Sequence, residues 1–139
     1  SECPCAQSRP GTAADLEHAL RQAHLCTGRP IMVTETSAAA SVRNRRRWLH
    51  DSVAAVNRIR ADGLPLVGYT WFPAFSLVAW SYLTGAKPPG AYMAHMGLWD
   101  LRDDGNGTLL REPTGLEQEY AEIIAGEAQP QDLGEEAVA

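Results

Sequence analysis

The chain has 139 residues, 45% of them hydrophobic, which is enough for one domain with a modest core. Its formal net charge of −5 argues against a nucleic-acid-binding surface built on basic residues. No stretch approaches the ~18 apolar residues of a membrane-spanning helix, and the N-terminus lacks the pattern of a secretion signal, so we expect a cytoplasmic protein with no membrane partner.

The first predicted elements are a helix and a strand. A helix is expected from residue 12 to 27, because Leu16, Leu20 and Ala23 follow helical spacing and Gly28 ends the pattern. The apolar run 31–34 then predicts a short buried strand, which ends at Glu35.

A long helix and a second strand follow a loop of small residues at 37–41. One stripe of the helix carries the residues Leu49, Ser52, Val53, Val56 and Ile59, and residues 62–63 end it. The apolar run 64–72 predicts another buried strand. The order strand, helix, strand implies that the two strands are parallel.

The remaining chain predicts less regular structure. Residues 73–96 are expected to form a long aromatic loop, 97–110 a β-hairpin, and the segment from about 113 to 124 a last helix. We therefore expect a tail at 1–11, one domain at 12–125 and an acidic mobile tail at 126–139.

The basic residues and cysteines offer few functional candidates. Three cysteines cannot form a closed disulfide framework, so we expect reduced thiols. Zinc binding by Cys3, Cys5, His24 and Cys26 is disfavoured, because the last two lie two apart on a helix and point to opposite faces. We expect no metal and no cofactor, and the role of the three cysteines stays open.

Most other basic residues are expected at the surface. A solvated helix face is expected to carry Arg43, Arg45, Arg46 and Arg47, and surface positions are also expected for His18, His24 and His50. A structural role is expected for His95.

Glu35 is the first candidate for chemistry. A carboxylate at the end of a buried parallel strand lies at the sheet edge where barrels and open α/β sheets place reacting groups, although it can also simply face water or pair with an arginine. The second strand ends near Trp71, and sugars stack on such aromatic rings. The combination of a carboxylate and an aromatic platform favours a glycan ligand.

Several short motifs, taken in order, resemble the family 1 glycoside hydrolases, a retaining TIM-barrel clan. The run 30–35 is similar to the seventh barrel strand with its Thr-Glu nucleophile motif, and 43–49 to the Arg-rich helix that follows. Gly68, Tyr69 and Trp71 resemble the eighth strand. The resemblance continues through the loop tryptophan Trp80, the stretch 90–98 and the closing helix at 110–124.

Two departures leave the sugar specificity open. The family's nucleophile motif continues with Asn-Gly where this chain has Thr36-Ser37, and Ala79 replaces a glutamate that binds sugar hydroxyls. The resemblance implies a double displacement with Glu35 as nucleophile, and Trp71 and Trp80 as walls of the sugar subsite. Tyr69 is either a hydrogen-bond donor to the nucleophile or a core residue.

The expected fold class is α/β: the C-terminal part of a (β/α)8 TIM barrel, incomplete on its own, because a full barrel needs roughly 250 residues. The expected function is that of a segment of a retaining glycoside hydrolase that acts on a carbohydrate substrate, with the general acid supplied from outside the chain. The alternative is a catalytically silent α/β module that binds a glycan or a protein. Either way, open strand edges suggest a homodimer or docking on the rest of a barrel.

Overall fold

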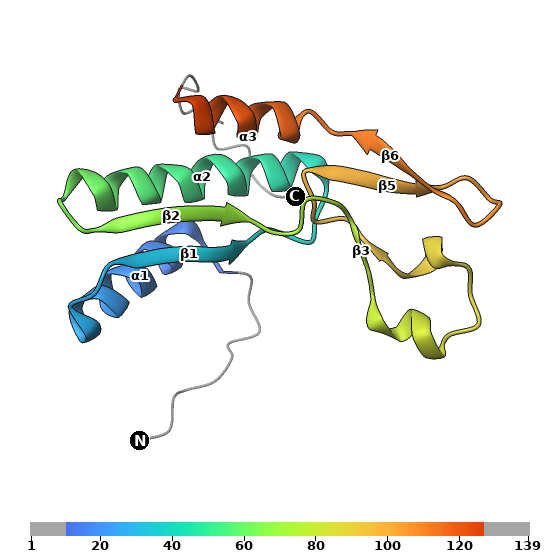
Figure 1. The fold of residues 1–139 in the computed structure, drawn as a ribbon, viewed down its shortest axis with the longest axis horizontal. Coiled ribbons are helices and arrows are strands. Elements are labelled where there is room, and N and C mark those ends of the chain that lie inside the picture. Colours follow the sequence, from blue (N-terminus) through green and yellow to red (C-terminus); the bar gives the residue numbers. More distant parts are fainter. Residues whose placement is uncertain (1–10, 127–139) are drawn as a thin grey trace, which may run out of the picture.

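A computed structural model describes residues 11–126 of the chain (Figure 1). Its elements in chain order are α1 (Ala13–Thr27), β1 (Ile31–Thr36), α2 (Val42–Ala61), β2 (Leu66–Trp71), β3 (Leu77–Val78), the 3-10 helices η1 (Trp80–Thr84) and η2 (Pro89–Tyr92), β4 (Met93–Ala94), β5 (Trp99–Asp103), β6 (Leu109–Pro113) and α3 (Leu116–Ala125). The predicted tails lie outside the described residues, apart from Gly11 and Gly126, and so do Cys3 and Cys5.

The helix ends follow local hydrogen-bonding chemistry. The Thr12 hydroxyl accepts the backbone N–H of Asp15, whose carboxylate accepts the N–H of Thr12, which makes a capping box at the start of α1. Gly28 ends α1 with a φ of 62°, a conformation that suits glycine. The Ser41 hydroxyl caps α2 by accepting the N–H of Asn44.

Strands β1 and β2 are parallel, as the order of the predicted elements requires. Helices α1 and α2 cover one face of this pair, where Val33 and Leu66 pack with Val56 and Ile59 of α2 (Figure 1). Elsewhere on the sheet, Met32 of β1 and Val67 of β2 stay 49% and 65% exposed. A layer of helices therefore protects one side of a two-stranded sheet whose other side is uncovered by the described residues.

The segment between β2 and β5 is more structured than the long loop that the sequence predicts. β3 and β4 pair antiparallel, and the Ala79 N–H donates to the Tyr92 carbonyl across the segment. Figure 1 shows this segment extending away from the paired strands β1 and β2. Strands of two residues have no readable periodicity, which explains why sequence patterns miss them.

The hairpin and last helix agree with the prediction. β5 and β6 pair antiparallel around a turn in which the Asp104 carboxylate accepts the N–H groups of Asn106 and Thr108. Helix α3 begins at Leu116, slightly later than expected, because Pro113 still belongs to β6. The fully buried Leu116 joins Leu49, Trp71 and Leu98 in a second core cluster.

Two surface predictions are wrong. Arg45 is 1% exposed instead of solvated, because it lies one turn before Leu49 on the buried stripe of α2 and its charge is paired with Asp100. His50 is also buried, and its Nε2 lies 3.0 Å from the Glu119 carboxylate of α3.

Candidate functional site

Glu35 is the next-to-last residue of β1, at the carboxyl end of the parallel pair. Its side chain is exposed, and none of the hydrogen bonds and ion pairs among residues 11–126 involves it. The neighbouring residue Thr36 pairs with Trp71, the last residue of β2. The structure therefore brings Glu35 and Trp71 to the same end of the sheet, as the sequence predicts.

Trp71 and Tyr69 are held by core contacts. Trp71 is 5% exposed, and its indole N–H donates to the Met96 carbonyl at 3.1 Å, so most of its ring surface is covered. The Tyr69 hydroxyl lies 2.8 Å from Ser52 Oγ of α2, and the Tyr120 hydroxyl bonds to the Tyr69 carbonyl. Burial raises the pKa of Tyr69 to about 12, so its phenol is protonated at neutral pH.

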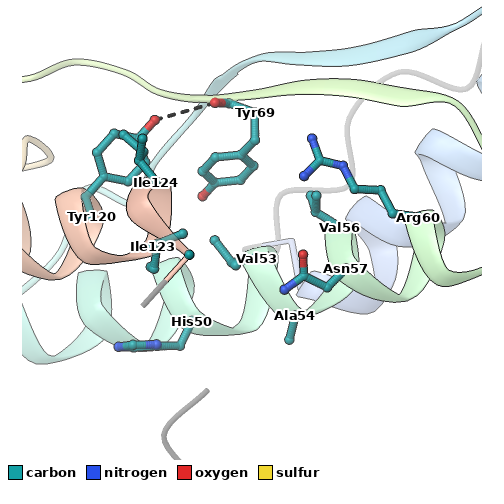
Figure 2. Close-up of a pocket in the computed structure, with 11 residues that line it drawn as sticks. His50, Val53, Ala54, Val56, Asn57, Arg60, Tyr69, Tyr120, Ile123 and Ile124 are labelled. Atoms are coloured by element: carbon teal, nitrogen blue, oxygen red, sulfur yellow. Dashed lines mark hydrogen bonds between the residues drawn. The ribbon is translucent and has the colours of Figure 1, made fainter. Parts of the chain in front are cut away.

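Figure 2 shows the Tyr69 ring pointing toward α2 and α3, into a cavity of about 460 Å³ on the helix side of the sheet. Two polar groups on its walls have partners: His50 bonds to Glu119, and the Arg60 guanidinium donates to the Leu66 carbonyl. Since this cavity does not include Glu35, it is a poor candidate for the reacting site.

Trp80 is placed apart from the other candidates. It begins η1 on the segment that extends from the body, and it is 87% exposed. This segment is braced by Tyr82 and Tyr92, whose rings meet edge-on at 5.9 Å. An exposed indole on a supported segment is available for stacking on a ligand.

A recess of about 510 Å³ adjoins the loop that follows Glu35. Residues 39–42 form one wall, and Arg45, His95 and Asp100 supply its polar side chains. The loop is bonded to the opposite side of the recess, because the Ala40 N–H donates to the His95 carbonyl at 3.1 Å.

Arg45 and Asp100, which line this recess, form a bidentate ion pair. Arg45 Nη1 and Nη2 lie 2.8 and 3.0 Å from the two Asp100 oxygens, and Nη1 also donates to the Gly97 carbonyl. Burial alone would raise the pKa of the Asp100 carboxyl, but the hydrogen bonds and charge of Arg45 outweigh it, so this pKa lies below its usual range. Asp100 is therefore ionised at neutral pH.

Ser76, His95 and Asp100 have the residue types of a nucleophilic triad but not its geometry. Ser76 Oγ and Asp100 Oδ1 lie 2.9 and 3.3 Å from the same histidine atom, Nδ1. A triad needs the base to contact the serine through one ring nitrogen and the acid through the other. The cluster is better explained as support for β5, whose Leu101 N–H donates to Ser76 Oγ.

Sequence reasoning missed the pairing of Arg45 with Asp100 and the contact of Trp48 with Thr36. Arg45 continues the buried stripe of α2 backward by one turn, so helical spacing alone could have identified it. Asp100, which is 55 positions from Arg45, carries no local signal. Trp48 donates its indole N–H to Thr36 Oγ1 at 2.9 Å, next to Glu35.

Two structural features were not found among residues 11–126. None of the helices there is long and apolar enough to cross a membrane. Within the same residues, no group of three or more histidine, cysteine or acidic side chains could hold a metal ion. The proposed zinc ligands Cys3 and Cys5 lie outside this part of the chain, and Cys26 is an exposed thiol.

No model of a known protein family matches the sequence, and no characterised protein matches it in a sequence search. Solved structures do match the fold. The beta-glycosidase from the hyperthermophile Thermosphaera aggregans is 20% identical with a TM-score of 0.67, and the match covers 87% of this chain and 23% of that one.

Two further structures have the same fold over most of this chain. The hyperthermophilic beta-glucosidase from Pyrococcus furiosus is 20% identical with a TM-score of 0.63, over 85% of this chain and 23% of its own. The psychrophilic beta-glucosidase from Micrococcus antarcticus is 19% identical with a TM-score of 0.62, over 89% and 28% respectively. The chain thus has the α/β fold of part of a beta-glucosidase barrel and spans about a quarter of the length of these structures.

Proposed function

We propose that this chain is the C-terminal segment of a retaining glycoside hydrolase in which Glu35 is the nucleophile. The observation that carries the proposal is the position of Glu35 at the carboxyl end of a parallel strand, in a fold shared with beta-glycosidases. Because the carboxylate is exposed and has no partner among the described residues, it is free to approach a substrate.

The proposed reaction is a double displacement. The Glu35 carboxylate attacks the anomeric carbon and forms a glycosyl ester while the glycosidic oxygen leaves with a proton from a general acid. Water then cleaves the ester, and the same acid, now a base, takes a proton from that water. The acid must lie about 5 Å from the nucleophile in a retaining enzyme.

The acid is proposed to come from outside this chain. Asp100 is held by Arg45, and its pKa is lowered, so it has no proton to donate at neutral pH. Glu112 belongs to β6 of the hairpin, not to the end of a parallel strand, and its carboxylate is bound to Arg102. The open edges of the β1–β2 sheet are where we propose that the rest of a barrel docks and completes the site.

For the sugar subsite we propose Trp80 as the exposed stacking wall, and Trp71 and Tyr69 as core residues that hold the end of β2 in place. The burial of Trp71 and the bond between Tyr69 and Ser52 support this role. The alternative, a silent glycan-binding module, is favoured by one observation, the 87% exposure of Trp80 on a chain that spans a quarter of its structural relatives.

The test uses glucosides that differ in their need for an acid. A dinitrophenyl leaving group departs without protonation, whereas a methyl glucoside needs a general acid. We expect the chain to release dinitrophenolate from the dinitrophenyl glucoside only, in a burst followed by slow turnover, because the base of the second step is also missing. We expect Glu35→Gln to abolish this release. Azide should restore turnover of the dinitrophenyl glucoside in Glu35→Ala by replacing the missing nucleophile.

Three other outcomes would each contradict part of the proposal. Cleavage of both glucosides would contradict the proposal that the acid lies outside the chain. Sugar binding that is lost in Trp80→Ala, without cleavage of either glucoside, would favour the silent module. Full activity in Glu35→Gln would exclude Glu35 as the nucleophile.

A further inference from the structure

Strand β1 carries one extra residue, relative to β2, just before its end. Val33 pairs with Tyr69 and Thr36 pairs with Trp71, so Thr34 and Glu35 of β1 lie opposite the single residue Thr70 of β2. Such a bulge breaks the alternation of side chains along a strand and can redirect one of them. Both Thr34 and Glu35 are exposed, although alternation alone would put Glu35 on the same face as the buried Val33.

The bulge is anchored on both sides. Before it, Val33 is 5% exposed and packs in the first core cluster. After it, Thr36 accepts two hydrogen bonds: its carbonyl from the Phe72 N–H at 3.1 Å, and its hydroxyl from the Trp48 indole N–H at 2.9 Å. The second bond comes from α2 and reaches the residue directly after Glu35.

The Trp48 ring has a fixed place from which to make this bond. Trp48 is half-buried and packs against the second core cluster, beside Leu49. Its backbone carbonyl accepts the Ser52 hydroxyl one turn later in α2. Since Glu35 itself contacts no other described side chain through a hydrogen bond or ion pair, its direction depends on the backbone at the bulge.

We propose that Trp48 is a positioning residue for Glu35, acting through its hydrogen bond to Thr36 to fix the bulge. This inference rests on the proposed role of Glu35 as nucleophile. A nucleophile has to be held within about 0.5 Å of its reacting position by neighbours that are themselves rigid. A tryptophan set in the core meets that requirement better than a flexible surface side chain.

The test compares Trp48→Phe, which keeps an aromatic ring but removes the N–H, with Thr36→Val, which removes the hydroxyl at similar size. Arg60→Met is the matched control, because Arg60 also makes a helix-to-strand hydrogen bond, to the Leu66 carbonyl at the other end of the sheet. The probe is a dinitrophenyl 2-deoxy-2-fluoroglucoside. Its fluorine, on the carbon next to the anomeric carbon, slows hydrolysis of the glycosyl ester, so the ester accumulates on the protein.

We expect the maximal labelling rate to fall about tenfold or more in both variants, as misplacement of a reacting group does, with no change in the half-saturating probe concentration. The double variant should be no slower than either single variant, because both remove the same bond. Arg60→Met should label at the wild-type rate. Wild-type labelling in Trp48→Phe, or effects that multiply in the double variant, would overturn the proposal.

A second measurement separates this inference from the proposed function. Hydrogen exchange of the Phe72 amide reports on its bond to the Thr36 carbonyl whether or not the chain reacts with sugars. We expect it to quicken about fivefold in Trp48→Phe and Thr36→Val, in line with the loss of one ordinary hydrogen bond, and not in Arg60→Met. If the wild type fails to label, the proposed function fails. If Phe72 exchange is unchanged, Trp48 does not hold the bulge and the inference fails.

Discussion

At the scale of single residues, Glu35 and Asp100 show how environment separates two carboxylates. Glu35 is exposed at a strand end with no ion-pair partner among the described residues. Asp100 is bound by Arg45, which is almost fully buried. The Glu35 carboxylate is therefore accessible to a ligand, whereas the Asp100 carboxylate joins the hairpin to α2.

Replacing Asp100 with asparagine should destabilise the protein strongly at neutral pH. The change leaves the Arg45 charge buried without a counter-ion, which costs about 3–5 kcal/mol in comparable pairs. Urea unfolding monitored by tryptophan fluorescence would measure the loss. The control is Asp51→Asn, which changes an exposed carboxylate on α2, the helix of Arg45, and should change the free energy of unfolding by less than about 0.5 kcal/mol.

The same pair predicts a pH dependence. Because the pKa of Asp100 is lower in the folded state than in the unfolded state, its stabilisation is present above about pH 4 and is lost as the pH falls through the folded-state pKa. The stability difference between the wild type and Asp100→Asn should therefore shrink in acid. An equal difference at neutral and acidic pH would contradict this account of the ion pair.

At the scale of elements, α2 organises the candidate site. One stripe of this helix supplies Arg45 to the hairpin, Leu49 to the second core cluster and Ser52 to Tyr69 of β2. Trp48 lies next to that stripe and reaches β1. The helix therefore connects both strand ends to the hairpin, and its apolar spacing made the element predictable from the sequence.

Gly97 lies where the segment between β2 and β5 joins β5, and we expect this position to tolerate no side chain. A Cβ there would lie 2.4 Å from the Phe75 carbonyl carbon, so backbone has to move. We expect Gly97→Ala to lower the free energy of unfolding by about 1–3 kcal/mol, the range for overpacking. Gly11→Ala is the control, since a Cβ there meets no atom within 4 Å. Equal stabilities of the two variants would show that the junction is looser than described.

At the scale of the whole molecule, the chain has one layer of helices on a sheet of two parallel strands. The sequence predicted this order of elements and the parallel pairing, because helical and strand patterns are local and strand-helix-strand units have one common arrangement. It did not predict the pairing of β3 with β4 or the bond between Arg45 and Asp100. Such contacts join residues far apart in the chain, and no local pattern encodes them.

The sequence predicted the positions of the candidate residues only in part. The strand pattern placed Glu35 and Trp71 at one end of the sheet, as the structure has them. It did not reveal that Trp71 is buried while Trp80 is exposed, since burial at a strand end depends on what the distant segments 96–98 and 116–120 cover. The bulge at Glu35 was also invisible, because register is a property of two strands together.

The most direct test of the central claim is to locate the covalent intermediate. The chain is incubated with the fluorinated dinitrophenyl glucoside, digested and analysed by mass spectrometry. We predict one added fluoroglucosyl group, on the peptide that contains Glu35, and none in Glu35→Gln. A label on another residue, or an unchanged label in Glu35→Gln, would contradict the assignment of Glu35 as the nucleophile.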